Sequence, residues 1–361
     1  MAQLMEYKCP NCGGGLEFNS SVQKMKCPFC DAEFEMDALA IYDQDLKEDG
    51  DSQMEWESSA ANTWQEGETD NMRVYVCESC SGEVIADETL GATACPYCGN
   101  PVVMKGQFQG DLKPDYVIPF KLDKEAAKRN FREHLVGKKL LPKSFKTEAN
   151  IEEIKGVYVP FWLFDANAKA RARFKGTKVR SWSDSRYNYT QTKYYSVVRG
   201  GSLDFTHVPV DGSTKMDDAL MESLEPFDFK DAVDFQTAYL SGYLADKYDV
   251  DEETTVKRAN TRIEKSALEA IEKTVTGYAT VTCEDSAIRL SNTASKYALY
   301  PVWVMTTKWR DNIYMFAMNG QTGKFVGNLP CDKGLYKKYL FLSGGIAFAV
   351  SLAITYLVYM L

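Results

Sequence analysis

The feature that most constrains this chain is a cysteine pattern that occurs twice. Each copy has two C-x2-C pairs separated by fourteen residues, and the copies begin at Cys9 and Cys77. The two-residue gap lets both thiolates of a pair point at one ion, and the insert is long enough for a hairpin that brings the second pair opposite the first. We therefore expect two zinc ribbons, each with one structural Zn2+. The predicted metal ligands are Cys9, Cys12, Cys27, Cys30, Cys77, Cys80, Cys95 and Cys98.

The surroundings of these cysteines favour metal binding over disulfides. The N-terminus has no apolar run of signal-peptide length, so we expect the ten cysteines to lie in a reducing compartment. Four thiolates would fill every position around each ion and leave none for a catalytic water. A structural zinc contributes about 10 to 16 kcal/mol of apparent binding energy, which is large beside the core of a unit of roughly 30 residues. We therefore expect the ribbons to unfold without metal.

Acidic residues concentrate at the N-terminal end. Residues 1–105 carry 6 Lys and Arg against 20 Asp and Glu, whereas residues 106–361 carry 36 against 31. Residues 37–72 alone hold eleven acids and one Lys. Such a stretch cannot bury enough apolar area to offset its chain entropy, which indicates an acidic flexible linker.

The pattern after the second ribbon is typical of an α+β domain with a mainly antiparallel sheet. A helix is expected to begin after the cap Asp123 and to end at Gly137, and another is expected near 217–224. Apolar residues at three- and four-residue intervals predict the longest amphipathic helix over 252–275. The predicted parts are zinc ribbon 1 (1–36), the acidic linker (37–72), zinc ribbon 2 (73–105), the α+β domain (106–332), and a basic flank with a transmembrane anchor (333–361).

Residues 157–175 alternate with period two and predict a long strand, with 186–199 as its neighbour. The two faces of the strand carry Ala168, Ala170, Ala172 and Phe174 on one side, and Lys169, Arg171, Arg173 and Lys175 on the other. Lys178 and Arg180 extend the basic row. The row has two interpretations: a solvated sheet face, or a surface that holds anionic lipid or an acidic partner.

The C-terminal residues 340–361 are 22 consecutive residues without a charge. A helix of this length spans about 33 Å, enough to cross a hydrocarbon core of about 30 Å. Four lysines precede it (Lys324, Lys333, Lys337 and Lys338), against one acid, Asp332. Positive flanks stay in the cytoplasm, so we expect a single-pass protein of the cell membrane whose folded body faces the cytoplasm. A buried core helix is the alternative.

Several segments together resemble a known family. They are the two ribbons, the stretches 159–166 (VPFWLFDA), 299–305 (LYPVWVM) and 319–324 (NGQTGK), and the hydrophobic tail. With them the chain resembles bacterial membrane-anchored proteins with zinc ribbons of the transcription-factor-IIB type, the YdjG-like proteins of Gram-positive bacteria. The resemblance implies a non-enzymatic protein that works beside membrane-stress and flotillin-like partners. It does not imply a helicase, because Gly323-Lys324 is followed by Phe325 and forms no phosphate-binding loop.

These observations favour a membrane-anchored adaptor or scaffold that contacts membrane lipid and recruits membrane-associated proteins in the cytoplasm. Gly345, Ala349 and Ala353 lie four residues apart and allow self-association through the anchor. The alternative is a membrane-tethered nucleic-acid-binding factor. Nucleic acid is the weaker expectation, because residues 1–36 and 73–105 each carry a net charge of −2.

The remaining alternative is an enzyme whose pocket lies in the α+β domain. The two histidines, His134 and His207, have no nucleophile or carboxylate at a motif distance, so we expect no catalytic residues. Cys283 and Cys331 lie outside the repeats, and we expect both to be inert thiols.

Overall fold

The chain divides into two compact units in the computed structural model. Unit 1 comprises residues 1–58, 164–208 and 256–294, and unit 2 comprises 59–163, 209–255 and 295–361. The structure describes residues 9, 14–36, 39, 52–56, 62–87, 94–107, 112–142, 145, 154–310, 312–327 and 329–360. These residues form mostly sheet with four α-helices, which confirms the predicted α+β class.

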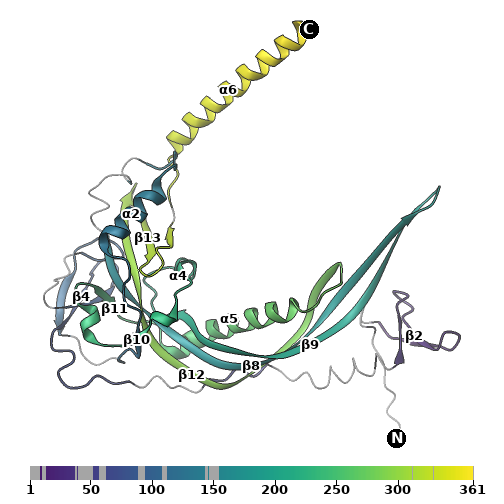
Figure 1. The fold of residues 1–361 in the computed structure, drawn as a ribbon, viewed down its shortest axis with the longest axis horizontal. Helices are drawn as coiled ribbons and strands as arrows, with labels where there is room; N and C mark the ends of the chain where they lie inside the picture. Colours follow the sequence, from purple (N-terminus) through teal and green to yellow (C-terminus); the bar gives the residue numbers. More distant parts are fainter. Residues whose placement is uncertain are drawn as a thin grey trace. The chain divides into compact units, whose positions relative to one another are not determined.

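Unit 2 is built on a sheet whose strands come from distant parts of the sequence (Figure 1). The strand order is β10-β7-β12-β8-β11-β5-β4-β6, and β13 pairs with β12 and β14. The pairs β11–β8 and β12–β7 are parallel, while β4, β5, β6, β13 and β14 pair antiparallel. The strands are β4 (Met72–Val76), β5 (Glu83–Asp87), β6 (Val103–Gln107), β7 (Tyr116–Val117), β8 (Lys155–Ser183), β10 (Val233–Asp234), β11 (Leu244–Asp246), β12 (Thr280–Trp309), β13 (Asn312–Asn319) and β14 (Phe325–Gly327).

Two helices of unit 2 lie where the sequence predicts them. α2 (Lys124–Leu135) begins after Asp123, whose carboxylate accepts a hydrogen bond from the Ala126 N–H at 2.7 Å and so satisfies one of the free amides of the first turn. Its buried face packs into an apolar cluster with Trp303 and Phe316. α4 (Asp218–Leu224) is capped in the same way by Asp217. Two short 3-10 turns, η2 (Phe229–Asp231) and η3 (Thr237–Leu240), complete the unit.

Unit 1 contains the rest of β8 and β12, together with most of β9 (Asn188–Asp211), which pairs with β8, and most of α5 (Glu252–Glu272). α5 lies along these strands (Figure 1). The predicted alanine face of β8 is confirmed: Ala168, Ala170, Ala172 and Phe174 are all buried, in one cluster with Ile263 and Ala267 of α5. The small side chains let the helix approach the sheet closely, as dense core packing requires.

The basic face of β8 is less uniform than the sequence predicts. Lys169 is exposed, but Arg173 is only 9% exposed and its guanidinium lies 3.4 Å from the Asp285 carboxylate. The interpretation of the basic row as a solvated sheet face is therefore wrong at Arg173. The acid that pairs with Arg173 comes from β12, and no local pattern in β8 could have predicted it.

Part of the predicted acidic linker packs against unit 1. Gln53 forms a parallel bridge with Arg289, and the Trp56 ring lies 4.9 Å from the Phe164 ring. The Trp56 indole N–H also donates to the Asn260 side chain at 2.7 Å. Met54 and Trp56 pack against the apolar cluster of unit 1. The overall acidic composition of 37–72 did not predict this packing. The remainder of 37–51 lies outside the described residues, except for Leu39.

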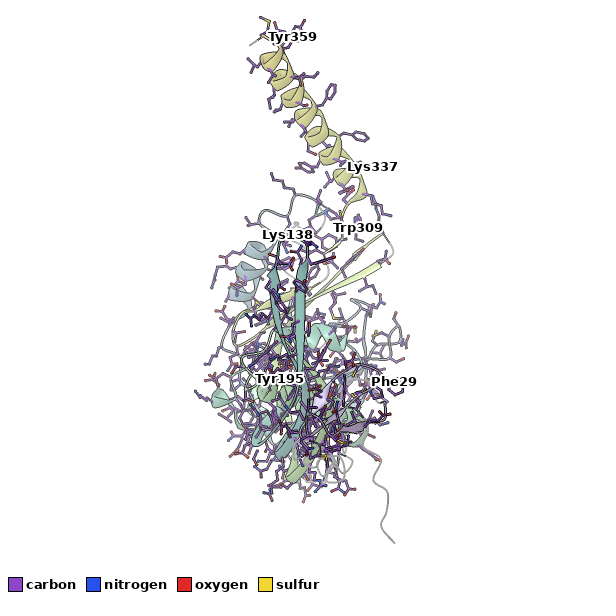
Figure 2. All side chains as sticks on the ribbon, turned by 90° about the vertical axis from the view of Figure 1, so that its right-hand side faces the viewer. Phe29, Lys138, Tyr195, Trp309, Lys337 and Tyr359 are labelled. Atoms are coloured by element: carbon purple, nitrogen blue, oxygen red, sulfur yellow. The ribbon has the colours of Figure 1, made fainter. Side chains whose placement is uncertain are left out.

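The C-terminal helix α6 (Lys333–Met360) has 28 residues and no buried side chain. It is the one helix in the described chain that is long and apolar enough to cross a membrane. Lys337 and Tyr359 mark its two ends, and apolar side chains project from it in every direction (Figure 2). The structure thus agrees with the predicted span in length and in apolar surface.

Candidate metal centres

The first cysteine of each of the four pairs makes the same backbone hydrogen bond. The N–H of the first cysteine of a pair donates to the carbonyl five residues later, as in Cys77 to Gly82 at 2.9 Å and Cys95 to Asn100 at 2.7 Å. The same bond joins Cys9 to Gly14 at 2.6 Å and Cys27 to Ala32 at 2.9 Å. In the three pairs whose residues are all described, these bonds fold the C-x2-C segment into a knuckle that brings both sulfurs into the metal group.

A second feature of the knuckle is a residue with positive φ directly after the second cysteine. Asp31 has φ 56°, Ser81 has φ 55° and Gly99 has φ 70°. The left-handed region tolerates Gly and short polar side chains, so the small residues at these positions follow from the turn. The sequence therefore encodes the knuckle locally, which is why its position was predictable.

The four sulfurs of the second ribbon lie together in unit 2. The sulfurs of Cys77 and Cys98 are 3.5 Å apart, those of Cys80 and Cys95 are 3.6 Å apart, and all four lie within 4.8 Å of one another. Sulfurs placed about 2.3 Å from a tetrahedral zinc are about 3.8 Å from each other. The described geometry can hold a metal ion with four cysteine ligands.

The thiols of this group differ in how easily they ionise. Burial raises the pKa of Cys95 and of Cys80. Burial also opposes ionisation of Cys77, but the backbone N–H groups of Cys80 and Ser79 and the neighbouring thiols outweigh it and lower its pKa to about 7. Cys77 is therefore more ready than Cys80 or Cys95 to lose its proton to an incoming cation.

The first ribbon brings three predicted ligands together. Cys9, Cys27 and Cys30 form a group that can hold a metal, with Cys9 and Cys30 sulfurs 3.6 Å apart. Cys12, the fourth predicted ligand, lies outside the described residues and stays a prediction. The ribbon is a separate three-stranded sheet of β1 (Glu17–Asn19), β2 (Lys24–Lys26) and β3 (Glu33–Phe34).

The two ribbons differ in their surroundings. In the second ribbon, β5 pairs with β11 through Ala86 and Leu244, and the Thr306 hydroxyl of β12 donates to the Pro96 carbonyl at 2.7 Å. Three of its cysteines are buried in the same apolar cluster as Val157, Leu163 and Tyr300. The second ribbon is therefore part of the core of unit 2, which the sequence pattern did not reveal.

A single pair of equivalent side chains displays the difference. Phe29 and Tyr97 occupy the same position in their knuckles, and each ring lies over the equivalent glycine, Gly14 or Gly82. Tyr97 is 4% exposed and belongs to the core of unit 2, whereas Phe29 is 76% exposed. The exposed ring of Phe29 is the surface feature that sequence reasoning missed.

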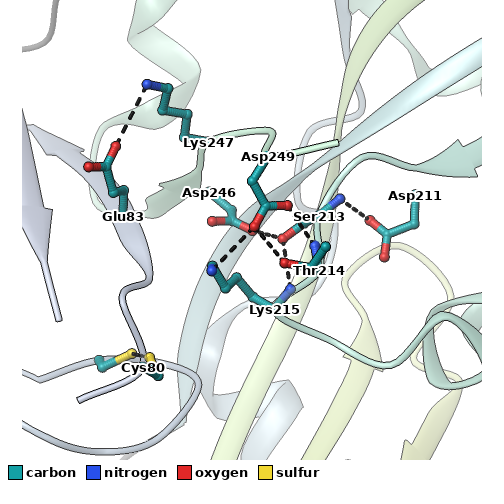
Figure 3. Close-up of polar contacts among 10 residues, drawn as sticks. Cys80, Glu83, Asp211, Ser213, Thr214, Lys215, Asp246, Lys247 and Asp249 are labelled. Atoms are coloured by element: carbon teal, nitrogen blue, oxygen red, sulfur yellow. Dashed lines mark hydrogen bonds and ion pairs between the residues drawn. The ribbon is translucent and has the colours of Figure 1, made fainter. Parts of the chain in front are cut away.

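A polar network with the buried residues Asp211, Ser213 and Asp246 is drawn in Figure 3 together with Cys80 of the second ribbon. The Ser213 hydroxyl donates to the Asp246 carboxylate at 2.5 Å, and the Ser213 N–H donates to Asp211 at 3.2 Å. Complete burial raises the pKa of Asp246 to about 7. Burial, followed by the nearby charge of Asp246, raises the pKa of the Tyr97 phenol. The network links β11 electrostatically to the knuckle of the second ribbon.

Other chemically active groups have structural roles where the chain is described. A cavity of about 780 Å³ in unit 2 is lined by His134, Asp217 and Ser223, among others. Asp217 caps α4, the Ser223 hydroxyl donates to the Ala219 carbonyl at 2.7 Å, and His134 contacts the Lys138 ammonium at 2.7 Å. Burial and then the Lys138 charge lower the pKa of His134. These contacts do not form a nucleophile–base pair.

The remaining predicted residues are placed apart from the metal groups. His207, in β9, has a positive φ of 54° and its N–H donates to the Asp165 carboxylate. Cys283 and Cys331 are both exposed and belong to neither metal group. Partial burial raises the pKa of the Cys283 thiol, which lowers its reactivity.

Comparison with known proteins finds one relative that matches almost end to end. A protein of Bacillus subtilis (strain 168), named YdjG and described as uncharacterized, is 33% identical over 350 residues, covering 97% of both chains. No protein-family model and no solved structure matches.

Proposed function

This chain belongs to the family of Bacillus subtilis YdjG, and we propose that it works as a membrane-anchored zinc-ribbon adaptor. In this proposal α6 crosses the cell membrane once, unit 2 is a folded platform, and the first ribbon recruits cytoplasmic protein partners. The ribbon type is that of transcription factor IIB, and the partners are membrane-associated proteins of the flotillin-like or membrane-stress kind. Neither ribbon takes part in catalysis.

Zinc is the metal that the donor set supports best. Four thiolates with sulfur spacings near those of a tetrahedral site match structural zinc, and no position stays open for a water. In the first ribbon, Cys12 would complete the same set. Metal analysis of the purified full-length protein should find two zinc ions per chain, and one or none would contradict the proposal.

Membrane attachment rests on α6 and its flank. The helix is 28 residues long, exposes its apolar side chains, and begins beside Lys333, Lys337 and Lys338. The positive flank supports an orientation with both units in the cytoplasm. Self-association through α6 is part of the proposal, because the small residues Gly345, Ala349 and Ala353 lie four apart and let a second helix approach closely.

The observation that carries the adaptor function is the exposed ring of Phe29. Its counterpart Tyr97 is covered by other parts of unit 2. The Tyr97 ring is buried, and the carbonyls of Pro96 and Tyr97 accept hydrogen bonds from the Thr306 hydroxyl. Exposed aromatic side chains of this size are the usual anchors of protein interfaces. Phe29 supports recruitment of a partner with an apolar pocket.

The test is co-purification of partners with full-length protein from detergent-solubilised membranes. Phe29→Ala should reduce the recovered partners about tenfold or more, as expected for an anchor residue. Val22→Ala is the matched control, because it removes an exposed apolar side chain from the turn at the other end of the β1–β2 hairpin. Unchanged partners in the Phe29 variant would contradict the proposal.

A further inference from the structure

The β8–β9 hairpin ends in a two-stranded tip that takes no part in a core. Every residue from 178 to 196, called here the hairpin tip, is exposed. At the base of the tip the Thr177 and Thr280 hydroxyls are 2.5 Å apart, and Tyr278 contacts the Tyr195 ring at 5.5 Å and the Lys178 ammonium at 5.2 Å. Yet the tip carries large side chains that a solvated hairpin does not need: Val179, Trp182, Tyr187, Tyr189, Tyr194 and Tyr195. Their exposure calls for a ligand outside the fold.

One face of the tip combines aromatic rings with cations. Lys178, Arg180 and Trp182 alternate along β8 and so share a face. Across the strand pair, Tyr195 lies beneath the Lys178 ammonium at 5.3 Å, and Tyr189 stacks on Trp182 at 5.5 Å. This face continues the alanine face of β8, so the expectation that Lys178 and Arg180 extend the row of Lys169 and Arg171 is wrong. α5 covers this face in the middle of the strand and leaves it uncovered at the tip.

The charge of the tip is opposite to that of the chain. Four cations, Lys178, Arg180, Arg186 and Lys193, stand against a single acid, Asp184, whereas the whole chain carries −9. Asp184 is used within the turn, where it accepts hydrogen bonds from two backbone N–H groups and the Tyr189 hydroxyl. Those bonds lower the pKa of the Asp184 carboxyl. In the described chain the four cations form no ion pair, so the tip presents uncompensated positive charge.

We propose that the hairpin tip binds a membrane surface rich in anionic lipid headgroups. Trp and Tyr favour the boundary between headgroups and acyl chains, because their rings are apolar and their N–H and O–H groups remain hydrated. Lys and Arg next to them attract anionic phosphates and extend their stems along the apolar surface. The tip offers both chemistries at one exposed end. This inference rests on the proposed attachment by α6, which brings the tip to a membrane at high local concentration.

Single-stranded nucleic acid is the competing anionic ligand, and the ring geometry disfavours it. Base stacking needs free ring faces. In the tip, Trp182 and Tyr189 cover each other, and the ammonium groups of Lys175 and Lys178 lie over Tyr194 and Tyr195 at 4.9 and 5.3 Å. The exposed aromatic side chains and the four cations suit an interface of lipid headgroups.

The experiment reconstitutes full-length protein in nanodiscs of phosphatidylcholine alone or mixed with phosphatidylglycerol, and measures hydrogen exchange of residues 178–196. We expect slower exchange of the tip in the anionic discs. The triple variant Lys178→Glu, Arg180→Glu and Lys193→Glu should abolish this protection. The matched control reverses three exposed lysines of the same unit, Lys257 and Lys265 of α5 and Lys273 directly after it, and should keep the protection.

The outcomes separate this inference from the proposed function. Equal exchange of the tip in both kinds of disc would overturn the inference and leave membrane anchoring intact. Protection by a single-stranded oligonucleotide, without protection by anionic lipid, would overturn it in favour of nucleic acid. Protein that does not co-elute with nanodiscs would refute attachment by α6, and the inference would fall with it. Loss of protection in the α5 variant would also overturn it, because net charge alone would then explain the effect.

Discussion

The first and second ribbons share a knuckle but differ in what covers it. Both have the same cysteine spacing, the same bond from the first cysteine to the fifth residue beyond it, and an aromatic ring over the equivalent glycine. In the second ribbon, β11 pairs with β5, Thr306 of β12 donates a hydrogen bond to the Pro96 carbonyl, and Tyr97 is buried. In the first, Phe29 is exposed. A duplicated metal site can thus provide stability in one copy and an accessible surface in the other.

The largest expected difference comes from removing one ligand from each ribbon. Cys95→Ser and Cys27→Ser should each lower the metal content by one ion. Cys95→Ser should also unfold the core of unit 2, because the roughly 10 to 16 kcal/mol of metal binding is coupled there to β5, β11 and β12. Hydrogen exchange of residues 298–305 should therefore become fast.

Cys27→Ser serves as the control for that experiment. Its effect should be confined to residues 15–36, with exchange of 298–305 unchanged. If fast hydrogen exchange extended equally far from the substituted cysteine in both variants, the contrast between the ribbons would be refuted.

A smaller difference is expected from the equivalent aromatic residues. Tyr97→Ala should lower the free energy of unfolding of unit 2 by about 3 to 5 kcal/mol, because it opens a cavity in the core. Phe29→Ala should change stability by less than about 0.5 kcal/mol, as for other surface positions. Denaturant unfolding of the metal-loaded protein measures both. Tyr97→Phe keeps the ring and should retain most of the stability; equal losses in the two alanine variants would refute the contrast.

The smallest expected effect concerns pH and sharpens the comparison at Asp246, which lies beside the second ribbon. Its folded pKa of about 7 exceeds the unfolded value near 4, so the native state holds the proton more tightly. The contribution of this group to stability is present below about pH 4 and is lost as pH rises toward 7, at up to about 1.4 kcal/mol per pH unit.

Asp246→Asn removes this dependence. Between about pH 5.5 and 7, wild-type unit 2 should lose about 2 kcal/mol of stability relative to the variant. Protonation of the cysteines acts in the opposite direction, but it is common to both proteins and cancels in the comparison. Parallel pH curves for wild type and variant would show that Asp246 does not titrate in this range.

The parts that the sequence predicted are those with local causes. The knuckles follow from cysteine spacing and from residues that tolerate positive φ, α2 from the cap Asp123, and the covered face of β8 from its alternating alanines. Each needs only neighbours within one turn or one strand.

The parts that escaped prediction depend on distant residues. The pairing of β5 with β11 joins segments about 160 positions apart, and the burial of Arg173 requires Asp285. Phe29 and Tyr97 stand in nearly identical motifs, so no local pattern distinguishes the exposed ring from the buried one. In the linker, Trp56 was a signal: a large aromatic residue among acids that packs on unit 1.

The position of the second ribbon within unit 2 also bears on biosynthesis. Unit 2 is assembled from residues 59–163, 209–255 and 295–361, so the strands that cover the ribbon are translated long after its cysteines. A nascent chain can close its first metal site early, whereas the second stays uncovered until translation is nearly complete. We expect cells starved of the metal to make chains whose unit 2 stays open, and we expect proteases to degrade these chains before they accumulate.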